Sequence, residues 1–269
     1  MKVLFFGDIV GSLGITAVSD VLRSLVKRYG VDLVIANGEN ATRGFGINYR
    51  DANALKDAGV DVITLGNHWH NRRSIDEFIE EIDGLIRPYN VRDVDEGRGL
   101  ITLDVHGVPV TVVNLLGTAF MKEEVTSPSV CMYDIIDQAP QGIIIVDYHA
   151  ESTSEKSTFA HYFDGQVSAV VGTHTHVQTN DARVLPLGTA FISDVGMCGQ
   201  YDSVIGFEPK SVVERIIYGD PHPMEIATEG EKCINAVLME FDDETFMARS
   251  IRPLFYIEGK ERVYGEDHL

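Results

Sequence analysis

Cysteine is scarce in this chain of 269 residues: the three are Cys131, Cys198 and Cys233. An odd number of widely spaced cysteines argues against a disulfide framework, so we expect free thiols in a reducing compartment. No apolar run approaches the ~18 residues that a membrane span requires. Met1 and Lys2 lead directly into a short apolar run with no cleavage site after it, unlike a secretory signal. These absences predict a soluble cytoplasmic protein that does not bind membranes.

Basic residues are also few. The 22 Lys and Arg face 41 Asp and Glu, which gives a formal net charge of −19. Binding to nucleic-acid backbones needs a basic surface, so we expect no stable nucleic-acid partner. A small phosphate substrate remains compatible with this charge, because bound metal ions can dominate the local field of a site.

Short apolar runs alternate with amphipathic segments in the first part of the chain. We expect strands at 2–6, 32–36 and 60–65 and helices at 15–29, 49–58 and 74–82. Ser74 and Glu77 should form a capping box at the start of the last helix. This order predicts a parallel sheet with right-handed crossovers.

From Gly99 the rhythm changes. We expect a hairpin around His106-Gly107, with strands at 100–105 and 109–115. Further elements are expected as helices at 131–138, 154–163 and 209–218, strands at 143–146 and 167–171, a hairpin within 183–195, and paired strands at 234–240 and 246–252. With no linker or repeat, residues 1–269 should form a single domain. We expect 253–269 to be an extended polar tail, suited to contacts in a homo-oligomer.

Polar side chains that can bind metals follow several of the apolar runs where each run ends. They are Asp8, Glu39, Asn40, Asn67, His68, His149, His174 and His176. In open α/β sheets the carboxyl ends of the strands form the edge where ligands bind. Mixed oxygen and nitrogen donors suit Mn²⁺, Fe²⁺ and Zn²⁺. One metal ion does not need this many ligands, whereas two metal ions bridged by a carboxylate do.

Each of these residues also has an ordinary structural explanation. Asp8 could cap the following helix, and Glu39 and Asn40 could be turn residues. His149 could donate to a backbone carbonyl in the core. The whole set is unlikely to reach one edge by chance, and we therefore favour the metal site.

Several segments carry a family likeness: GDIVG at 7–11, NGEN at 37–40, GNH at 66–68, DYHAE at 147–151, TSEK at 153–156 and VVGTHTHVQT at 170–179. With them the chain resembles the calcineurin-like metallophosphoesterases and, over nearly its whole length, the YmdB-like bacterial phosphodiesterases. The resemblance implies an α/β fold, a four-layer α/β/β/α sandwich of two mixed sheets flanked by helices. It also implies hydrolysis of cyclic nucleotides, with 2′,3′-cyclic nucleotides favoured, and two metal ions, with Fe or Mn favoured over Zn.

The resemblance further implies a role for each site residue: Asp8, Asn40 and His176 bind one metal, Asn67, His149 and His174 bind the other, Glu39 bridges them, and His68 is the general acid. A metal-bridging hydroxide would attack the phosphorus of a small phosphodiester. Val10 stands where the wider superfamily has His, and the bridge is Glu39 instead of Asp, both as in the YmdB-like branch.

Trp69 and His70 depart from that branch, which more often has a small residue and then Trp after Gly-Asn-His. His70 is therefore an alternative acid. Two other functions also remain open at this stage. One is a phosphomonoesterase such as a nucleotidase, and the other is a regulatory protein that keeps the metal site to bind a nucleotide.

Overall fold

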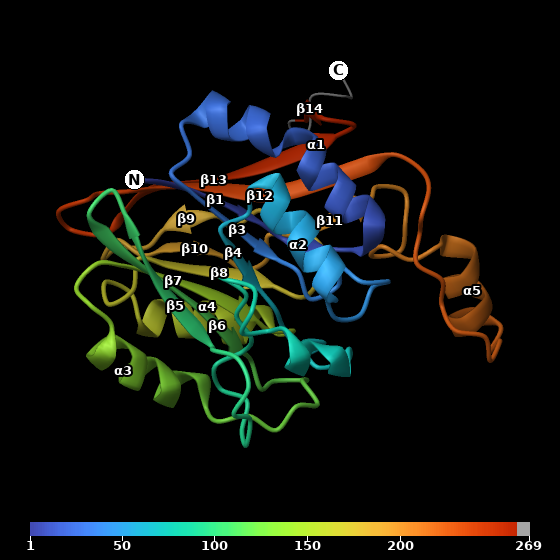
Figure 1. Ribbon diagram of the computed structural model, residues 1–269, viewed down its shortest axis with the longest axis horizontal. Coiled ribbons are helices and arrows are strands. Elements are labelled where there is room, and N and C mark those ends of the chain that lie inside the picture. Colours follow the sequence, from blue (N-terminus) through green and yellow to red (C-terminus); the bar gives the residue numbers. More distant parts are fainter. Residues whose placement is uncertain (263–269) are drawn as a thin grey trace.

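Two mixed β-sheets lie face to face, with helices on their outer sides (Figure 1), in the computed structural model, which describes residues 1–262. The first sheet has the order β14-β13-β12-β1-β3-β4, with β11 beside β12 and β2 beside β11. Its strands are β1 (Lys2–Phe6), β2 (Asp8–Ile9), β3 (Leu33–Asn37), β4 (Val62–Thr64), β11 (Met197–Gln200), β12 (Lys232–Phe241), β13 (Ala248–Ile257) and β14 (Lys260–Glu261).

The second sheet has the order β5-β6-β7-β8-β10-β9. Its strands are β5 (Leu100–Val105), β6 (Val108–Leu116), β7 (Ile143–His149), β8 (Ala169–Thr173), β9 (Arg183–Val184) and β10 (Ala190–Ile192). In the first sheet the parallel strands β1, β3 and β4 form one end, and β12 and β13 join β1 in antiparallel order. In the second sheet the parallel strands β6, β7, β8 and β10 lie between the antiparallel strands β5 and β9.

The helices are α1 (Gly11–Tyr29), α2 (Tyr49–Ala58), α3 (Pro128–Gln138), α4 (Thr153–Tyr162) and α5 (Pro209–Ile217), with a short 3₁₀ helix at Arg73–Glu77. Helices α1 and α2 cover the outer face of the first sheet and α3 and α4 that of the second, whereas α5 stands apart at one side (Figure 1). The four-layer α/β/β/α sandwich expected from the sequence is confirmed.

The central strands are mostly apolar because both of their faces are covered. In β1, Val3 and Phe5 face the second sheet, and Leu4 and Phe6 face the helices, as the two-residue period of a strand requires. The three cysteines are buried and form no disulfide, as expected. Within residues 1–262, no helix is long and apolar enough to cross a membrane.

Two expectations for the first half were wrong. Helix α1 begins at Gly11 rather than at residue 15, and Gly14 lies in its first turn. A Cβ atom on Gly14 would lie 2.3 Å from the Cys198 carbonyl oxygen, so this glycine lets α1 approach β11 closely. The helix expected at 74–82 is only a 3₁₀ turn with no side-chain cap, because Phe78 leaves the helical region at φ −135°. Its apolar residues are still buried.

Two boundaries in the second half also differ. Helix α3 begins at Pro128, three residues before the expected start, since proline suits the first helical turn. The tail expected to start at residue 253 is a strand at its beginning: β13 continues to Ile257 and β14 pairs with it. The rest of that expected tail, residues 263–269, lies outside the described part of the chain.

Candidate metal centre

The structure brings all eight predicted site residues to one edge, where the parallel strands of both sheets end. Asp8 lies on β2 just after β1, and the other first-sheet residues follow β3 and β4. His149 is the last residue of β7, and His174 and His176 follow β8. The two sheets therefore supply opposite sides of the same site.

One group of donors surrounds the Nε2 atom of His149. Glu39 Oε1 lies 3.0 Å from it, Asn67 Oδ1 3.0 Å and His174 Nδ1 3.1 Å. Ligand atoms of Glu39, His149 and His174 all lie within 4.8 Å of one another, a spacing that could hold a metal ion. Two imidazole nitrogens and two oxygens make a donor set that suits Mn, Fe or Zn.

A second group lies on the other side of Glu39. His176 Nε2 is 3.8 Å from Asp8 Oδ1 and 3.1 Å from the Asn40 amide nitrogen, which is itself 3.2 Å from Glu39 Oε1. A half-turn of the Asn40 amide would present its oxygen, the atom that binds cations. Glu39 is thus the carboxylate shared by both groups.

Asp8 provides an independent sign that a cation belongs in this second group. Its side chain is buried, and Oδ1 accepts no hydrogen bond from residues 1–262. A buried carboxylate oxygen without a partner is costly, and a bound cation would satisfy it. The residues present therefore fit a metal ion at this position.

Outer hydrogen bonds fix which imidazole nitrogens face the centre. The Thr173 hydroxyl donates to Asp147 Oδ1 at 2.7 Å, so it accepts a hydrogen bond from His149 Nδ1 at 2.8 Å. His176 Nδ1 donates to the Ile205 carbonyl at 2.9 Å. Both residues keep Nε2 for a metal. Such outer partners orient ligands and raise their basicity.

His174 has the opposite arrangement. Its Nε2 lies 3.1 Å from Glu151 Oε2, which leaves Nδ1 facing the centre. Its backbone φ is 106°, and that of His176 is 65°, a region that residues other than glycine rarely adopt. The two-residue spacing of this pair therefore works only with a turn whose strain the surroundings must offset.

A buried ion pair holds that turn. Lys156 Nζ on α4 donates to the Thr173 carbonyl at 2.8 Å and to Asp194 Oδ2 at 2.9 Å. The same Asp194 oxygen accepts from the Thr175 N–H at 2.9 Å. Lys156 and Asp194 are both 1% exposed, so neither charge has water as an alternative partner.

We expect Lys156→Met to lower the free energy of unfolding by about 3–5 kcal/mol, because the variant leaves the Asp194 charge buried without its cation. The double variant Lys156→Met, Asp194→Asn should be destabilised less, since it removes both charges. Urea unfolding of the metal-free proteins measures both values. Equal stability of Lys156→Met and the wild type would contradict this role.

The buried ionisable side chains of the centre shift one another's pKa values. Burial raises the pKa of Asp8 to about 6, against the effect of His176 and His149. Burial also disfavours ionised Glu39, but His149 and then His68 reverse this and lower its pKa to about 2. Burial opposes a charged His149 as well, yet the carboxylate of Glu39, followed by Asp8, raises its pKa to about 9. A metal ion at His149 Nε2 needs the neutral imidazole, so its binding competes with a proton at this nitrogen.

His68 lies beside the donor groups. Its backbone N–H donates to Glu39 Oε2 at 3.0 Å. The Asn71 amide nitrogen lies 3.0 Å from His68 Nδ1 and donates to it, which places the proton of the neutral ring on Nε2. Burial lowers the pKa of His68, against the effect of Glu39. A neutral ring with Nε2–H is a hydrogen-bond donor toward a ligand.

His70 is held elsewhere. Its Nε2 lies 2.9 Å from both carboxylate oxygens of Asp76, and its ring stacks on the buried Trp69 at 4.6 Å. Neither contact involves a residue of the donor groups. The structure therefore gives no support to His70 as the alternative acid.

The sequence reasoning missed the outer layer of the centre. Asp147 is buried, and its Oδ2 accepts from Asn37 at 3.0 Å and from Thr64 at 2.5 Å. The local signal was present, since Thr64 and Asp147 are polar residues that directly follow the apolar runs of β4 and β7. The Lys156–Asp194 pair had no such signal, because its members are 38 residues apart.

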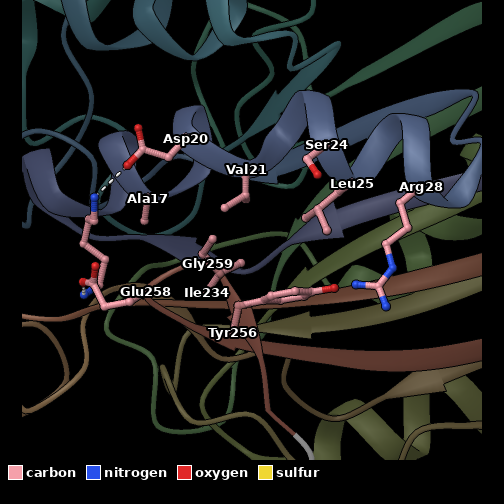
Figure 2. A pocket seen from close by; sticks show the side chains of 11 residues that line it. Ala17, Asp20, Val21, Ser24, Leu25, Arg28, Ile234, Tyr256, Glu258 and Gly259 are labelled. Carbon is pink, nitrogen blue, oxygen red and sulfur yellow. Dashed lines mark hydrogen bonds and ion pairs between the residues drawn. The ribbon is translucent and has the colours of Figure 1, made fainter.

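A cavity between α1 and the C-terminal strands lies apart from the candidate metal centre. It measures about 340 Å³, and Figure 2 shows Tyr256 lying beneath α1 with Arg28 at one end and Asp20 at the other. Lys232 Nζ donates a hydrogen bond to Asp20 Oδ2 at 2.7 Å. None of the predicted site residues lines this cavity.

The protein is an α/β/β/α sandwich with the metallophosphoesterase type of fold. Its two mixed sheets bring carboxylate, amide and imidazole donors together at one edge, where they form a candidate metal centre. Residues 4–254 match the family described as YmdB-like protein. The chain belongs to this family.

Named relatives agree with this placement. The chain is 38% identical over 271 residues to a 2′,3′-cyclic-nucleotide 2′-phosphodiesterase of Bacillus subtilis, covering 100% of this chain and 99% of that protein. A crystal structure described as a novel phosphatase, from Mycoplasma pneumoniae, has a TM-score of 0.90 at 34% identity, covering 96% of this chain and 93% of that one. The Haemophilus influenzae NAD nucleotidase shares the fold alone, with a TM-score of 0.54 at 15% identity over 99% of this chain and 60% of that one.

Proposed function

We propose that the protein is a metal-dependent phosphodiesterase that hydrolyses 2′,3′-cyclic nucleotides. The observation that carries the proposal is the buried Glu39 carboxylate between two groups of donors, one around His149 and one with Asp8 and His176. The Bacillus subtilis relative, which matches over its whole length, bears the name of this activity.

Two metal ions fit this arrangement, with iron or manganese favoured and zinc compatible. Asp8, Asn40 and His176 would hold one ion, Asn67, His149 and His174 the other, and Glu39 would bind both. When bound, such a pair of ions neutralises charge on a phosphate and makes a water molecule nucleophilic at neutral pH.

The residues of this chain then have separate tasks. His68 donates the Nε2 proton to the ribose oxygen that leaves phosphorus, because an alkoxide is too basic to leave unprotonated. Asn71 holds the proton on that nitrogen through its bond to Nδ1. Thr173 and Asp147 keep His149 in the tautomer that binds metal.

The proposal also covers the protein's location, the size of its substrate and its partners. The protein works in the cytoplasm on a small diester, as a single domain, and binds neither nucleic acids nor membranes stably. The net charge of −19 supports this choice of substrate over long RNA.

Manganese-loaded protein incubated with 2′,3′-cyclic AMP, and in parallel with AMP, tests the proposal. We expect the cyclic diester to be converted to a monophosphate while AMP stays intact, because the donor groups and one acid suffice for a single hydrolysis. Phosphate release from AMP would instead support a nucleotidase. Absence of turnover on both substrates, with metal bound, would favour a nucleotide-binding regulator.

A further inference from the structure

Phe45 is an exposed aromatic side chain beside the candidate centre. It lies in the loop between β3 and α2, and 38% of it is exposed. Its ring centroid is 5.0 Å from that of His68, with the two planes at 88°. Phe207 lies behind it, with ring centroids 5.8 Å apart. A large apolar ring thus stands at the rim of a strongly polar site.

The loop holds Phe45 firmly at this position. Arg72 donates to the carbonyls of Phe45 and Thr42, at 2.9 Å each, and the Thr42 N–H donates to the Gly46 carbonyl at 2.9 Å. A Cβ atom on Gly46, at φ 73°, would lie 2.7 Å from the Arg72 side chain. The exposure of Phe45 is therefore built into the loop and is no sign of a loose side chain.

The neighbouring loop ties Phe45 to the ligand set. Ile205, whose carbonyl accepts from His176, is two residues from Phe207, which packs on Phe45. The Phe45 ring thus lies between the general acid and the loop that supports a metal ligand. At this position an exposed apolar ring is placed to contact a planar ligand that reaches His68.

Resting on the proposed function, we propose that Phe45 is the stacking platform for the nucleobase of the substrate. The ribose oxygen must lie within hydrogen-bond reach of His68 to take its proton, about 2.6–3.2 Å. The base is attached to that same ribose, and the centroids of the Phe45 and His68 rings are 5.0 Å apart. A base on a ribose bound at His68 can therefore reach the Phe45 ring. Stacking on an aromatic ring tolerates any base but favours the larger purines.

The test compares two cyclic diesters in Phe45→Ala: 2′,3′-cyclic AMP, and glycerol 1,2-cyclic phosphate, which has the same five-membered diester but no base. We expect kcat/KM for cyclic AMP to fall about tenfold or more, chiefly through KM, and the value for the glycerol diester to stay unchanged. The preference for 2′,3′-cyclic AMP over 2′,3′-cyclic CMP should shrink as well. Phe45→Tyr should restore both properties.

Tyr218, which is 78% exposed at the end of α5, provides a matched control, and Tyr218→Ala should change neither substrate. An equal loss on both diesters in Phe45→Ala would mean that the ring only positions His68, and no loss on either would mean that it has no role; both outcomes overturn the proposal. If the wild type itself fails to hydrolyse 2′,3′-cyclic AMP, the proposed function fails first, which separates the two conclusions.

Discussion

Glu39→Gln should lose metal from both halves of the centre. Glu39 Oε1 lies 3.0 Å from His149 Nε2 and 3.2 Å from the Asn40 amide nitrogen, so one carboxylate serves both donor groups. Glutamine keeps the shape but offers one neutral oxygen in place of a charged pair. We expect occupancy after dialysis to fall at both positions, and activity to fall by more than the about 10–100-fold that loss of an outer partner costs.

Metal analysis by mass spectrometry of the dialysed protein measures this effect. Glu151→Gln is the matched control, because Glu151 is half-exposed and contacts the nitrogen of His174 that faces away from the centre. Because the control removes only an outer partner of His174, it should lose less metal than Glu39→Gln. Full metal occupancy at both positions in Glu39→Gln would contradict the proposal that Glu39 bridges two metal ions.

His68→Ala should keep its metal and lose rate. The hydrogen bond from His68 to Glu39 comes from the His68 backbone N–H, which alanine keeps, so we expect the substitution to leave the donor atoms in place. Loss of a general acid costs about 10²–10⁴-fold in rate. The loss should be large for 2′,3′-cyclic AMP, whose leaving alkoxide needs a proton. It should be small for bis-p-nitrophenyl phosphate, because nitrophenolate leaves without help.

His70→Ala is the control for this experiment, since His70 pairs with Asp76 at the surface. We expect near-normal rates on both substrates. Equal losses on the two substrates in His68→Ala would argue against proton donation by His68. A selective loss on the cyclic nucleotide in His70→Ala would transfer the role of acid to His70.

The layers of the fold could be predicted because they depend on local patterns. The apolar runs gave the buried strands, and His106 and Gly107, both at positive φ, form the turn of the expected hairpin. The segment after His70 could not be predicted correctly. Its apolar spacing is helical, yet packing of Ile75, Phe78 and Ile79 into the core is achieved by irregular turns.

The inner donors of the candidate site could be found because each follows a strand in the sequence. Their division into two groups came from the family resemblance and not from local pattern, since His149 and Asn67 are 82 residues apart and meet where the two sheets pack. The strained turn of His174 and His176 was equally hidden, because its support comes from Lys156 on α4 and Asp194 after β10. The local sequence shows where β8 ends, but it does not show that Lys156 and Asp194, which are distant in the sequence, form the hydrogen bonds that support the turn after it.

Diffraction from crystals soaked in Mn²⁺, recorded near the manganese absorption edge, tests the dinuclear centre most directly. We predict two anomalous peaks about 3.5–4 Å apart. One should lie among Asp8, Asn40 and His176 and the other among Asn67, His149 and His174, with the Glu39 carboxylate between them. A single peak, or peaks away from Glu39, would contradict the bridged two-metal centre.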